Sequence, residues 1–318
     1  MLRRVMTARV LLRTLSFLLL LAVLVWLFLR RPEDLVQLSD RLSDLPGSTW
    51  LMVFLLGLLS YVLRLLRWQV LLRVLGHRIP VTQQLPIYMA GFGLAMTPGK
   101  VGETIRTAYL APLGVPYGHS LAAFVAERLV DLLVVGLLAC LALPLVASHP
   151  IWVLSAWGFV LSAFLVARSR LLPAMAARMG TGKLGQTADE GARALQRLLS
   201  GRPLFVGCLL GSLAWSVQAS ALLVVLSHLE HPVPVLSGLG SYALALLAGA
   251  ASFIPGGLGV TEAAMLWLLE RQGVDLLTAA TAALVSRGVP LWTGVFTGLL
   301  ALAALGVRSA QSDRPTQP

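Results

Sequence analysis

Two short stretches of this chain combine proline, glycine and charge in a pattern that could bind an anion. The first is Pro98-Gly99-Lys100-Val101-Gly102-Glu103, and the second is Pro255-Gly256-Gly257-Leu258-Gly259. Each follows an apolar run, so each predicts a broken or re-entrant helix that restarts after the turn. A restarting helix presents free N–H groups and the positive end of its dipole, and Lys100 adds a full charge beside the first one. A phosphate is the ligand we expect there.

An arginine follows each stretch inside an apolar segment. Arg128 follows the first proline by 30 residues, and Arg287 follows the second by 32. Glu127 and Asp131 flank Arg128 at helical spacing, so we expect Arg128 to pair with Asp131 and these charges to mark the protein interior. A static ion pair that locks two helices is the competing interpretation.

Two further pairings follow from the spacing of the acids. Arg287 has no acidic neighbour in its own segment, so its counter-charge is expected from Glu262 or Glu103. Glu103 and Arg106 are three residues apart on the short helix after the first stretch, and they could pair with each other.

A cluster of arginine and tryptophan ends an earlier apolar segment. Arg64 and Arg67 are three residues apart and share a helix face, and Trp68 follows them. Such a cluster is typical of an interfacial anchor whose side chains reach the membrane surface. A contact with a lipid head group at the entrance of a cavity is the alternative.

The composition places the chain in a membrane, because 57% of its 318 residues are hydrophobic and 12% are charged. We therefore expect an all-α polytopic membrane protein. Runs near the length that a bilayer core requires, about 20 residues, cover 15–29, 49–66, 121–146, 151–167, 204–226 and 276–304. Two shorter runs, 85–97 and 239–254, lead into the two Pro-Gly stretches.

The basic residues predict how the chain crosses the membrane. Most Lys and Arg border the cytoplasmic ends of the segments if both termini are cytoplasmic. The net charge of +11 is then mainly a topology signal, with contact to anionic lipid as a secondary role and no binding of nucleic acid. The two Pro-Gly stretches enter from opposite sides in this topology, which predicts an inverted repeat.

The predicted organisation is one transmembrane domain over 1–308. Its parts are an N-terminal helix (14–30), repeat one (49–147), a connecting span with a cytoplasmic linker (151–202) and repeat two (203–306), followed by a disordered tail (309–318). The first apolar run resembles a signal peptide, but it ends in Arg30-Arg31-Pro32 without a small-residue cleavage site. We therefore expect a retained helix.

The linker contains the pattern Thr187-Ala188-Asp189-Glu190, which is typical of a capping box. It predicts the start of an amphipathic helix on the cytoplasmic surface, with leucines on one face and arginines on another.

Cysteine and histidine give no support for a disulfide, a metal or a cofactor. Cys140 and Cys208 lie far apart within apolar runs, as small buried side chains do. The histidines lie at segment ends or in loops, which leaves no pair within a segment to ligate haem; they are His77, His119, His149, His228 and His231.

Four motifs, taken in order, carry a family resemblance. They are Arg64-x-x-Arg67-Trp68, Pro98-Gly99-Lys100-Val101-Gly102-Glu103-x-x-Arg106, Glu127-Arg128-x-x-Asp131 and Pro255-Gly256-Gly257-Leu258-Gly259-x-x-Glu262-Ala263. Over about residues 10–305 the chain resembles the lysylphosphatidylglycerol synthase transmembrane domain family, also called flippase-like domain proteins. The resemblance implies movement of lipids or lipid-linked sugars between leaflets. Aminoacylating members add a soluble synthase domain, which we do not expect in this chain.

The expected function is that of an inner-membrane lipid flippase or scramblase with a polar cavity for a phosphate-bearing head group. The residues expected to hold the phosphate are Lys100, Arg128 and Arg287, with Arg64, Arg67 and Arg106 as further substrate-binding residues. The residues expected to balance charge or carry a proton are Glu103, Glu127, Asp131 and Glu262.

Two other functions fit the same sequence. A membrane enzyme acting on a lipid phosphate could use Glu127 or Asp131 as a general base. Alternatively, the chain could be a non-transporting partner that recruits a separate lipid synthase or glycosyltransferase through residues 171–202.

Overall fold

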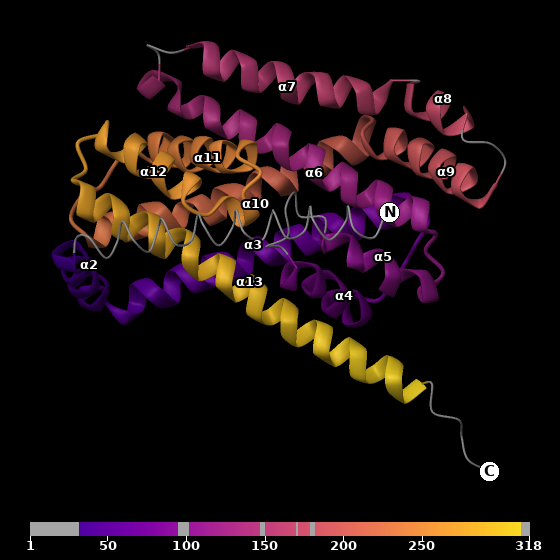
Figure 1. The fold of residues 1–318 in the computed structure, drawn as a ribbon, viewed down its shortest axis with the longest axis horizontal. Coiled ribbons are helices and arrows are strands. Elements are labelled where there is room, and N and C mark those ends of the chain that lie inside the picture. The colour runs from indigo at the N-terminus through magenta and orange to yellow at the C-terminus, as the bar shows by residue number, and fades with distance from the viewer. Residues whose placement is uncertain (1–31, 95–101, 147–149, 170, 179–181, 313–318) are drawn as a thin grey trace, which may run out of the picture. The chain divides into compact units, whose positions relative to one another are not determined.

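The computed structural model describes residues 32–94, 102–146, 150–169, 171–178 and 182–312 (Figure 1). These residues form helices joined by short turns and contain no strand, which confirms the predicted all-α fold. The chain divides into two compact units, residues 1–46 and residues 47–318. The first unit contributes α2 (Pro32–Asp44), a helix that we did not predict. The elements described below belong to the second unit.

Four helices among the described residues are long and apolar enough to cross a membrane. They are α3 (Gly47–Val74), α6 (Tyr117–Ala139) continued by the 3₁₀ helix η3 (Cys140–Val146), α10 (Gly201–His228) and α13 (Leu276–Ser312). Each exceeds the roughly 20 residues that span a bilayer core. Helix α7 (Pro150–Arg168) coincides with another predicted segment. The predicted segment 15–29 lies outside the described residues.

Helix α3 exposes apolar side chains and buries charged ones, the reverse of a helix in a water-soluble protein. Its exposed stripe, at helical spacing, consists of Leu51, Leu55, Leu59, Val62 and Leu66. Arg64 and Arg67 are buried. This distribution suits a helix with lipid on one side and polar protein interior on the other.

The second Pro-Gly stretch separates two helices, as predicted. Helix α11 (Val235–Ala251) ends before the tight turn η4 (Pro255–Gly257), and α12 (Val260–Glu270) begins after it. Gly256, Gly257 and Gly259 have φ values of 64°, 65° and 82°. Glycine adopts this left-handed backbone without the strain that a Cβ atom would cause.

The first Pro-Gly stretch lies mostly outside the described residues, which exclude Pro98, Gly99, Lys100 and Val101. The helix before it is α4 (Val81–Gly93). Gly102 begins the turn that leads into α5 (Ile105–Leu110), followed by the 3₁₀ helix η2 (Ala111–Leu113). A short helix through Leu110 is therefore present as predicted.

Two pairs of helices begin at matching positions in the two predicted halves. Helices α3 and α10 have 28 residues each and start 154 residues apart, at Gly47 and Gly201. Helices α4 and α11 also start 154 residues apart, at Val81 and Val235. Helix α4 packs on α13 and α11 packs on α6, so each half contacts the other in a reciprocal way. The spacing supports the predicted duplication, whose inverted orientation stays a prediction.

Helices α3 and α10 pack side by side and run antiparallel. Ser60 of α3 contacts Gln218 of α10, whereas Arg67, two turns further along α3, lies beside Gly211 of α10. Residue numbers therefore rise along one helix as they fall along the other. This pair brings the first helix of one predicted half against the first helix of the other.

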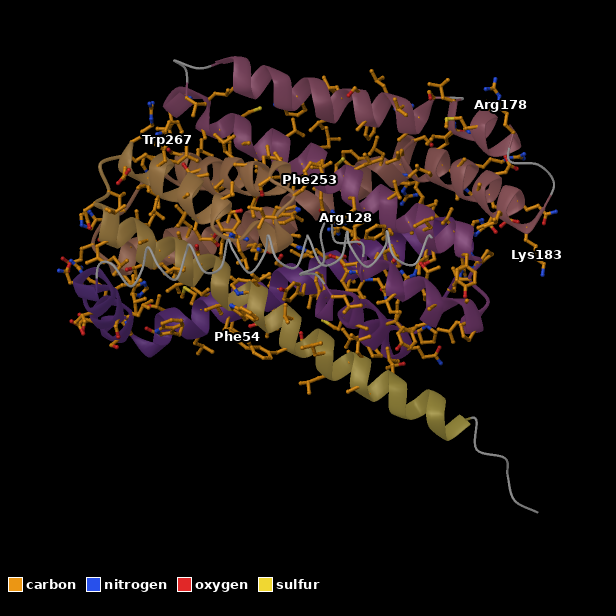
Figure 2. The ribbon with its side chains drawn as sticks, in the orientation of Figure 1. Phe54, Arg128, Arg178, Lys183, Phe253 and Trp267 are labelled. Carbon is orange, nitrogen blue, oxygen red and sulfur yellow. The ribbon has the colours of Figure 1, made fainter. Side chains whose placement is uncertain are left out.

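The linker forms α8 (Leu171–Arg178) and α9 (Lys183–Leu198), and α9 packs against α6. Figure 2 shows Arg178 and Lys183 at the ends of these helices, while Arg128 lies among the helices of the bundle. The predicted helix start at Thr187 is wrong, because Gly182 precedes the helix and Thr187 lies inside it. Gly118 of α6 packs closely on the backbone of Thr187, in the interior of this helix.

Replacing Gly298 of α13 by alanine is expected to destabilise the fold. A Cβ atom at Gly298 would overlap the backbone nitrogen of Gly93 in α4, so the two helices would have to separate. Overpacking of this kind costs about 1–3 kcal/mol, which thermal unfolding of the purified protein in detergent can measure. Gly288→Ala on the same helix is the matched control, since nothing lies within 4 Å of the added Cβ atom. Equal losses in both variants would contradict the prediction.

Candidate functional site

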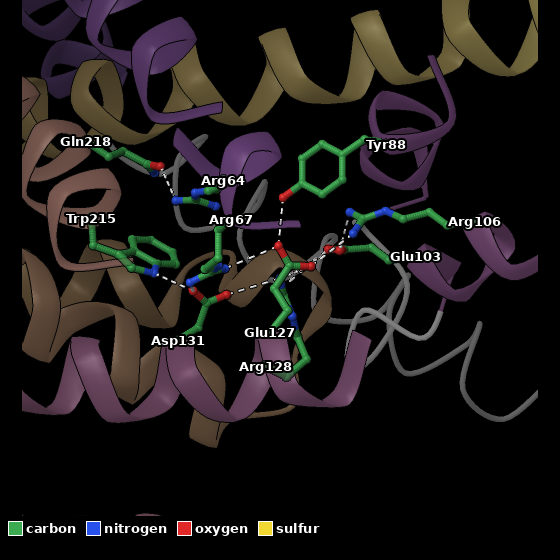
Figure 3. A network of polar contacts seen from close by, with 10 residues as sticks. All are labelled: Arg64, Arg67, Tyr88, Glu103, Arg106, Glu127, Arg128, Asp131, Trp215 and Gln218. Atoms are coloured by element: carbon green, nitrogen blue, oxygen red, sulfur yellow. Dashed lines mark hydrogen bonds and ion pairs between the residues drawn. The ribbon is translucent and has the colours of Figure 1, made fainter. Parts of the chain in front are cut away.

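Buried charged side chains surround Glu127 of α6 (Figure 3). Its Oε1 accepts hydrogen bonds from the Tyr88 hydroxyl at 2.7 Å and from Arg67 at 3.2 Å. Its Oε2 accepts one from Arg106 at 3.0 Å and lies 3.3 Å from Arg128 Nη2. Glu127 is fully buried, so these four partners replace water around the carboxylate.

Asp131 lies one turn further along α6 and extends the group. Its Oδ1 accepts hydrogen bonds from Arg67 at 2.8 Å and from the Trp215 indole at 2.9 Å. Its Oδ2 lies 3.1 Å from Arg128, which confirms the predicted pair. The four-residue spacing puts Asp131 and Glu127 on one face of α6. Both carboxylates thereby reach Arg67 of α3.

Glu103 and Arg106 complete the group from the segment before and within α5. They pair at 2.8 Å, as predicted, and Glu103 also lies 3.8 Å from Arg128. The Arg106 guanidinium stacks over the Tyr88 ring, 4.1 Å from its centroid. Gly91 of α4 leaves the space for it, because a Cβ atom there would overlap the Arg106 side chain.

The expectation that Arg64 and Arg67 are interfacial anchors is wrong. Arg67 is 0% exposed and Arg64 is 4% exposed, and both lie well inside α3, which continues to Val74. The prediction assumed that two arginines end the span near residue 66. Charged side chains that find partners inside the protein do not end a span.

Arg64 differs from the other arginines of the group. Among the residues that the structure describes it forms no ion pair: its Nη2 donates a hydrogen bond to Gln218 Oε1 at 2.5 Å, and its guanidinium lies 4.0 Å from the Trp215 ring centroid. Its Nε is buried without a hydrogen-bond partner in the described residues. The Arg64 charge is therefore shielded by a neutral amide and an aromatic face.

We call these seven charged residues the α6 cluster: Arg64, Arg67, Arg106, Arg128, Glu103, Glu127 and Asp131. Four arginines face three carboxylates, so within the described residues the α6 cluster carries one surplus positive charge. Arg128 is its most accessible ion-paired member, with 20% of the side chain exposed, whereas Arg67 and Arg106 are 1% exposed.

A smaller group of charges lies at the second Pro-Gly turn. Arg287 of α13 pairs with Glu262 of α12 and donates a hydrogen bond to the Gly256 carbonyl at 2.7 Å. Glu262 also accepts a hydrogen bond from the Gly259 N–H at 2.7 Å. This confirms the expectation that Glu262 supplies the counter-charge of Arg287. The turn is thereby tied to α13.

Tyr242 of α11 connects the two groups of charges. Its hydroxyl accepts a hydrogen bond from Gln218 at 3.0 Å, and it interacts electrostatically with both Arg64 and Arg287. We did not predict a role for Tyr242 or Gln218 from the sequence. Both are polar residues inside predicted apolar segments, and that position is the signal that could have found them.

One predicted phosphate-binding residue cannot be placed in the structure. Lys100 lies outside the described residues, so its predicted contact with phosphate stays a prediction. Over the described ranges, no group of three or more His, Cys, Asp or Glu side chains could hold a metal ion.

Two histidines form a contact that we did not predict. Nε2 of His77, in the turn after α3, lies 2.8 Å from Nδ1 of His119, in the first turn of α6. One ring must accept the hydrogen bond through an unprotonated nitrogen. Burial, and then the charge of His119, lower the pKa of His77. The contact therefore favours a neutral imidazole at His77.

Replacing Glu127 by glutamine is expected to destabilise the protein by about 3–5 kcal/mol, because it leaves buried arginines without their shared counter-charge. Asp189→Asn is the matched control, since Asp189 pairs with the largely exposed Arg193 at 2.7 Å. Loss of that exposed pair costs about 1 kcal/mol or less. Thermal unfolding of both variants in the same detergent provides the comparison, and similar losses would argue against a central role for Glu127.

Acidification is expected to weaken the contact between His77 and His119. Because the pKa of His77 is lowered in the folded state, the folded protein binds fewer protons than the unfolded chain. The stabilisation is complete above the ordinary histidine pKa of about 6.5 and is lost as the pH falls through the lowered value. The melting temperature between pH 7.5 and 5 should fall less in His77→Gln than in the wild type. His228→Gln, at an exposed histidine, should keep the wild-type slope.

The comparisons with known proteins agree with this fold. No curated protein matches the chain. The family model of the lysylphosphatidylglycerol synthase TM region matches residues 13–298, which is most of the chain. It describes a membrane domain associated with lipid-related, flippase-like function. The chain therefore belongs to the family of lysylphosphatidylglycerol synthase TM regions.

Proposed function

We propose that this protein moves a phosphate-bearing lipid between the leaflets of the inner membrane, with both termini in the cytoplasm. The observation that carries the proposal is the α6 cluster, in which four arginines and three carboxylates converge inside a domain with an apolar outer surface. Charged residues at membrane depth are costly and mark substrate pathways. Family membership adds the association with lipids.

The contacts of Arg128 suit a side chain that exchanges partners. It lies 3.1–3.8 Å from three carboxylates, whereas Arg67 and Arg106 each make one contact of 2.8 Å. With 20% of its side chain exposed, Arg128 can leave one carboxylate and contact a phosphate. Arg67 and Arg106 then hold the acids in place while the head group binds.

The second group of charges offers a further contact for the same head group. Arg287 is held by Glu262 and by the Gly256 carbonyl, and 20% of the Glu262 side chain is exposed. We propose that the phosphate passes between Arg128 and Arg287 while the acyl or isoprenoid tails stay in the lipid. Lys100 joins the first of these contacts in the proposal.

The hydrogen bonds of the carboxylates favour binding over catalysis. Glu127 and Asp131 already accept bonds from arginines, a tyrosine and a tryptophan. A carboxylate stabilised as an anion in this way is a weak general base. The acids therefore serve to balance charge as the ligand enters and leaves.

Leaflet exchange in liposomes tests the proposal. Protein-containing liposomes should exchange fluorescent phosphatidylglycerol between leaflets faster than protein-free liposomes. Arg128→Gln and Arg287→Gln should each lower the rate at least about tenfold, because each removes charged hydrogen bonds to phosphate. Arg193→Gln, at a side chain that is 74% exposed, is the control and should match the wild type.

Folding of the variants must be checked separately from transport. Gel filtration and thermal unfolding show whether Arg128→Gln and Arg287→Gln remain folded, and Arg128→Lys keeps the charge if the glutamine variant is unstable. Undiminished exchange by folded variants at both positions would refute the role given to these arginines. Exchange no faster than in protein-free liposomes would refute the transport function itself.

A further inference from the structure

No carboxylate in the described part of residues 47–312 forms an ion pair with Arg64, although Asp131 interacts with it electrostatically. The Arg64 side chain is 4% exposed, and its Nε is buried without a hydrogen-bond partner in that part of the chain. The undescribed residues 95–101 contain no acidic side chain. A buried cation without a direct ion pair, in a cluster with one more arginine than carboxylates, is unfavourable. The position of Arg64 therefore favours an anion that comes from outside the chain.

Arg64 lies where equivalent positions of the two halves meet. Arg64 is the eighteenth residue of α3, and Gln218 is the eighteenth residue of α10, which is also 28 residues long. The two side chains are hydrogen bonded, and the helices run antiparallel. A two-fold axis that relates the halves, as the sequence predicts, would pass through this contact. Transport sites in inverted-repeat proteins lie at the repeat interface near the bilayer midplane.

The surroundings of Arg64 hold it in one orientation without neutralising it. Gln218 accepts a hydrogen bond from Ser60 at 3.2 Å and donates one to Tyr242 at 3.0 Å, which fixes its amide. The Trp215 ring covers one face of the Arg64 guanidinium. An arginine held in this way is preorganised for a ligand.

We propose that Arg64 binds the phosphodiester of a phospholipid head group that carries one negative charge. This assignment rests on the proposed transport function and names the charge class of its substrate. A guanidinium presents parallel N–H donors that match two oxygens of a phosphate group. Inorganic phosphate offers the same oxygens and is the other possible source of the ligand.

The charge balance of the α6 cluster favours a ligand that carries a single negative charge. One such charge neutralises the surplus arginine, whereas a second would lie near Asp131, which already interacts electrostatically with Arg64. A phosphodiester carries one charge. A phosphomonoester carries between one and two near neutral pH. The site therefore prefers phosphatidylglycerol to phosphatidic acid.

Native mass spectrometry of the full chain in detergent can test the assignment with phosphatidylglycerol, phosphatidic acid and inorganic phosphate as probes. The wild type should retain phosphatidylglycerol at least about tenfold more strongly than Arg64→Gln does, because the variant lacks the charged donor. Arg193→Gln should match the wild type. Equal retention by the wild type and Arg64→Gln would overturn the assignment.

Exchanging the two equivalent residues gives a control for a merely structural role. The double variant Arg64→Gln, Gln218→Arg moves the cation across the same contact and should regain phosphatidylglycerol binding. Gln218→Arg alone adds a second cation and should shift the preference toward phosphatidic acid. If neither variant changes the binding of phosphatidylglycerol relative to phosphatidic acid, Arg64 does not determine which head-group charge the site prefers. Arg64-dependent binding of inorganic phosphate without lipid binding would overturn the lipid assignment.

Leaflet exchange with the same variants separates this inference from the proposed function. If the wild type exchanges phosphatidylglycerol and Arg64→Gln does so equally well, the assignment of Arg64 fails and the transport function stands. If the wild type binds phosphatidylglycerol through Arg64 but exchanges none, the transport function fails and the binding site stands.

Discussion

The structure depends on neutralising arginines that are buried at membrane depth. In water a guanidinium is solvated on all sides, but inside a membrane domain each one must find carboxylates or carbonyls. Glu127 alone contacts Arg67, Arg106 and Arg128, which come from α3, α5 and its own helix α6. One carboxylate thus joins three elements, and its loss would leave several cations without their shared partner.

This constraint also explains where glycine occurs in the surrounding helices. Arg106 occupies the space that a side chain at Gly91 would need, and Arg67 lies close to Gly211 of α10. Large planar guanidinium groups fit between helices only where a neighbouring residue lacks a side chain. The α6 cluster therefore determines backbone packing as well as charge balance, so any movement of a head group past it must leave most of these contacts intact.

The sequence was sufficient for contacts within one helix or turn and for the Arg287–Glu262 pair of successive helices. It was insufficient for contacts between elements far apart in the chain. The pairs Glu103–Arg106 and Arg128–Asp131 follow from helical spacing, and both are present. Arg67 reaches Glu127 across 60 residues and Arg64 reaches Gln218 across 154. Helical periodicity carries no information about contacts between residues so far apart in the chain. We therefore predicted that the segment containing Arg64 and Arg67 ends at the membrane surface, although α3 continues to Val74. All-α character and the second Pro-Gly turn were predictable, since they follow from composition and local backbone preference.

The first helices of the two predicted halves, α3 and α10, have the same length, but the halves differ in charge, and that difference bears on how a head group could move. All charges of the α6 cluster, Arg64 included, come from the first half. The second half contributes Gln218 and Trp215 there and keeps Arg287 at its own turn. A fully symmetric arrangement would place two cations at the contact between α3 and α10 and would bind a doubly charged ligand too firmly to release it. In the proposed transport, one arginine and one amide at equivalent positions would bind a single charge and release it toward either neighbouring arginine. Conduction of any ion or head group requires this balance between binding and release.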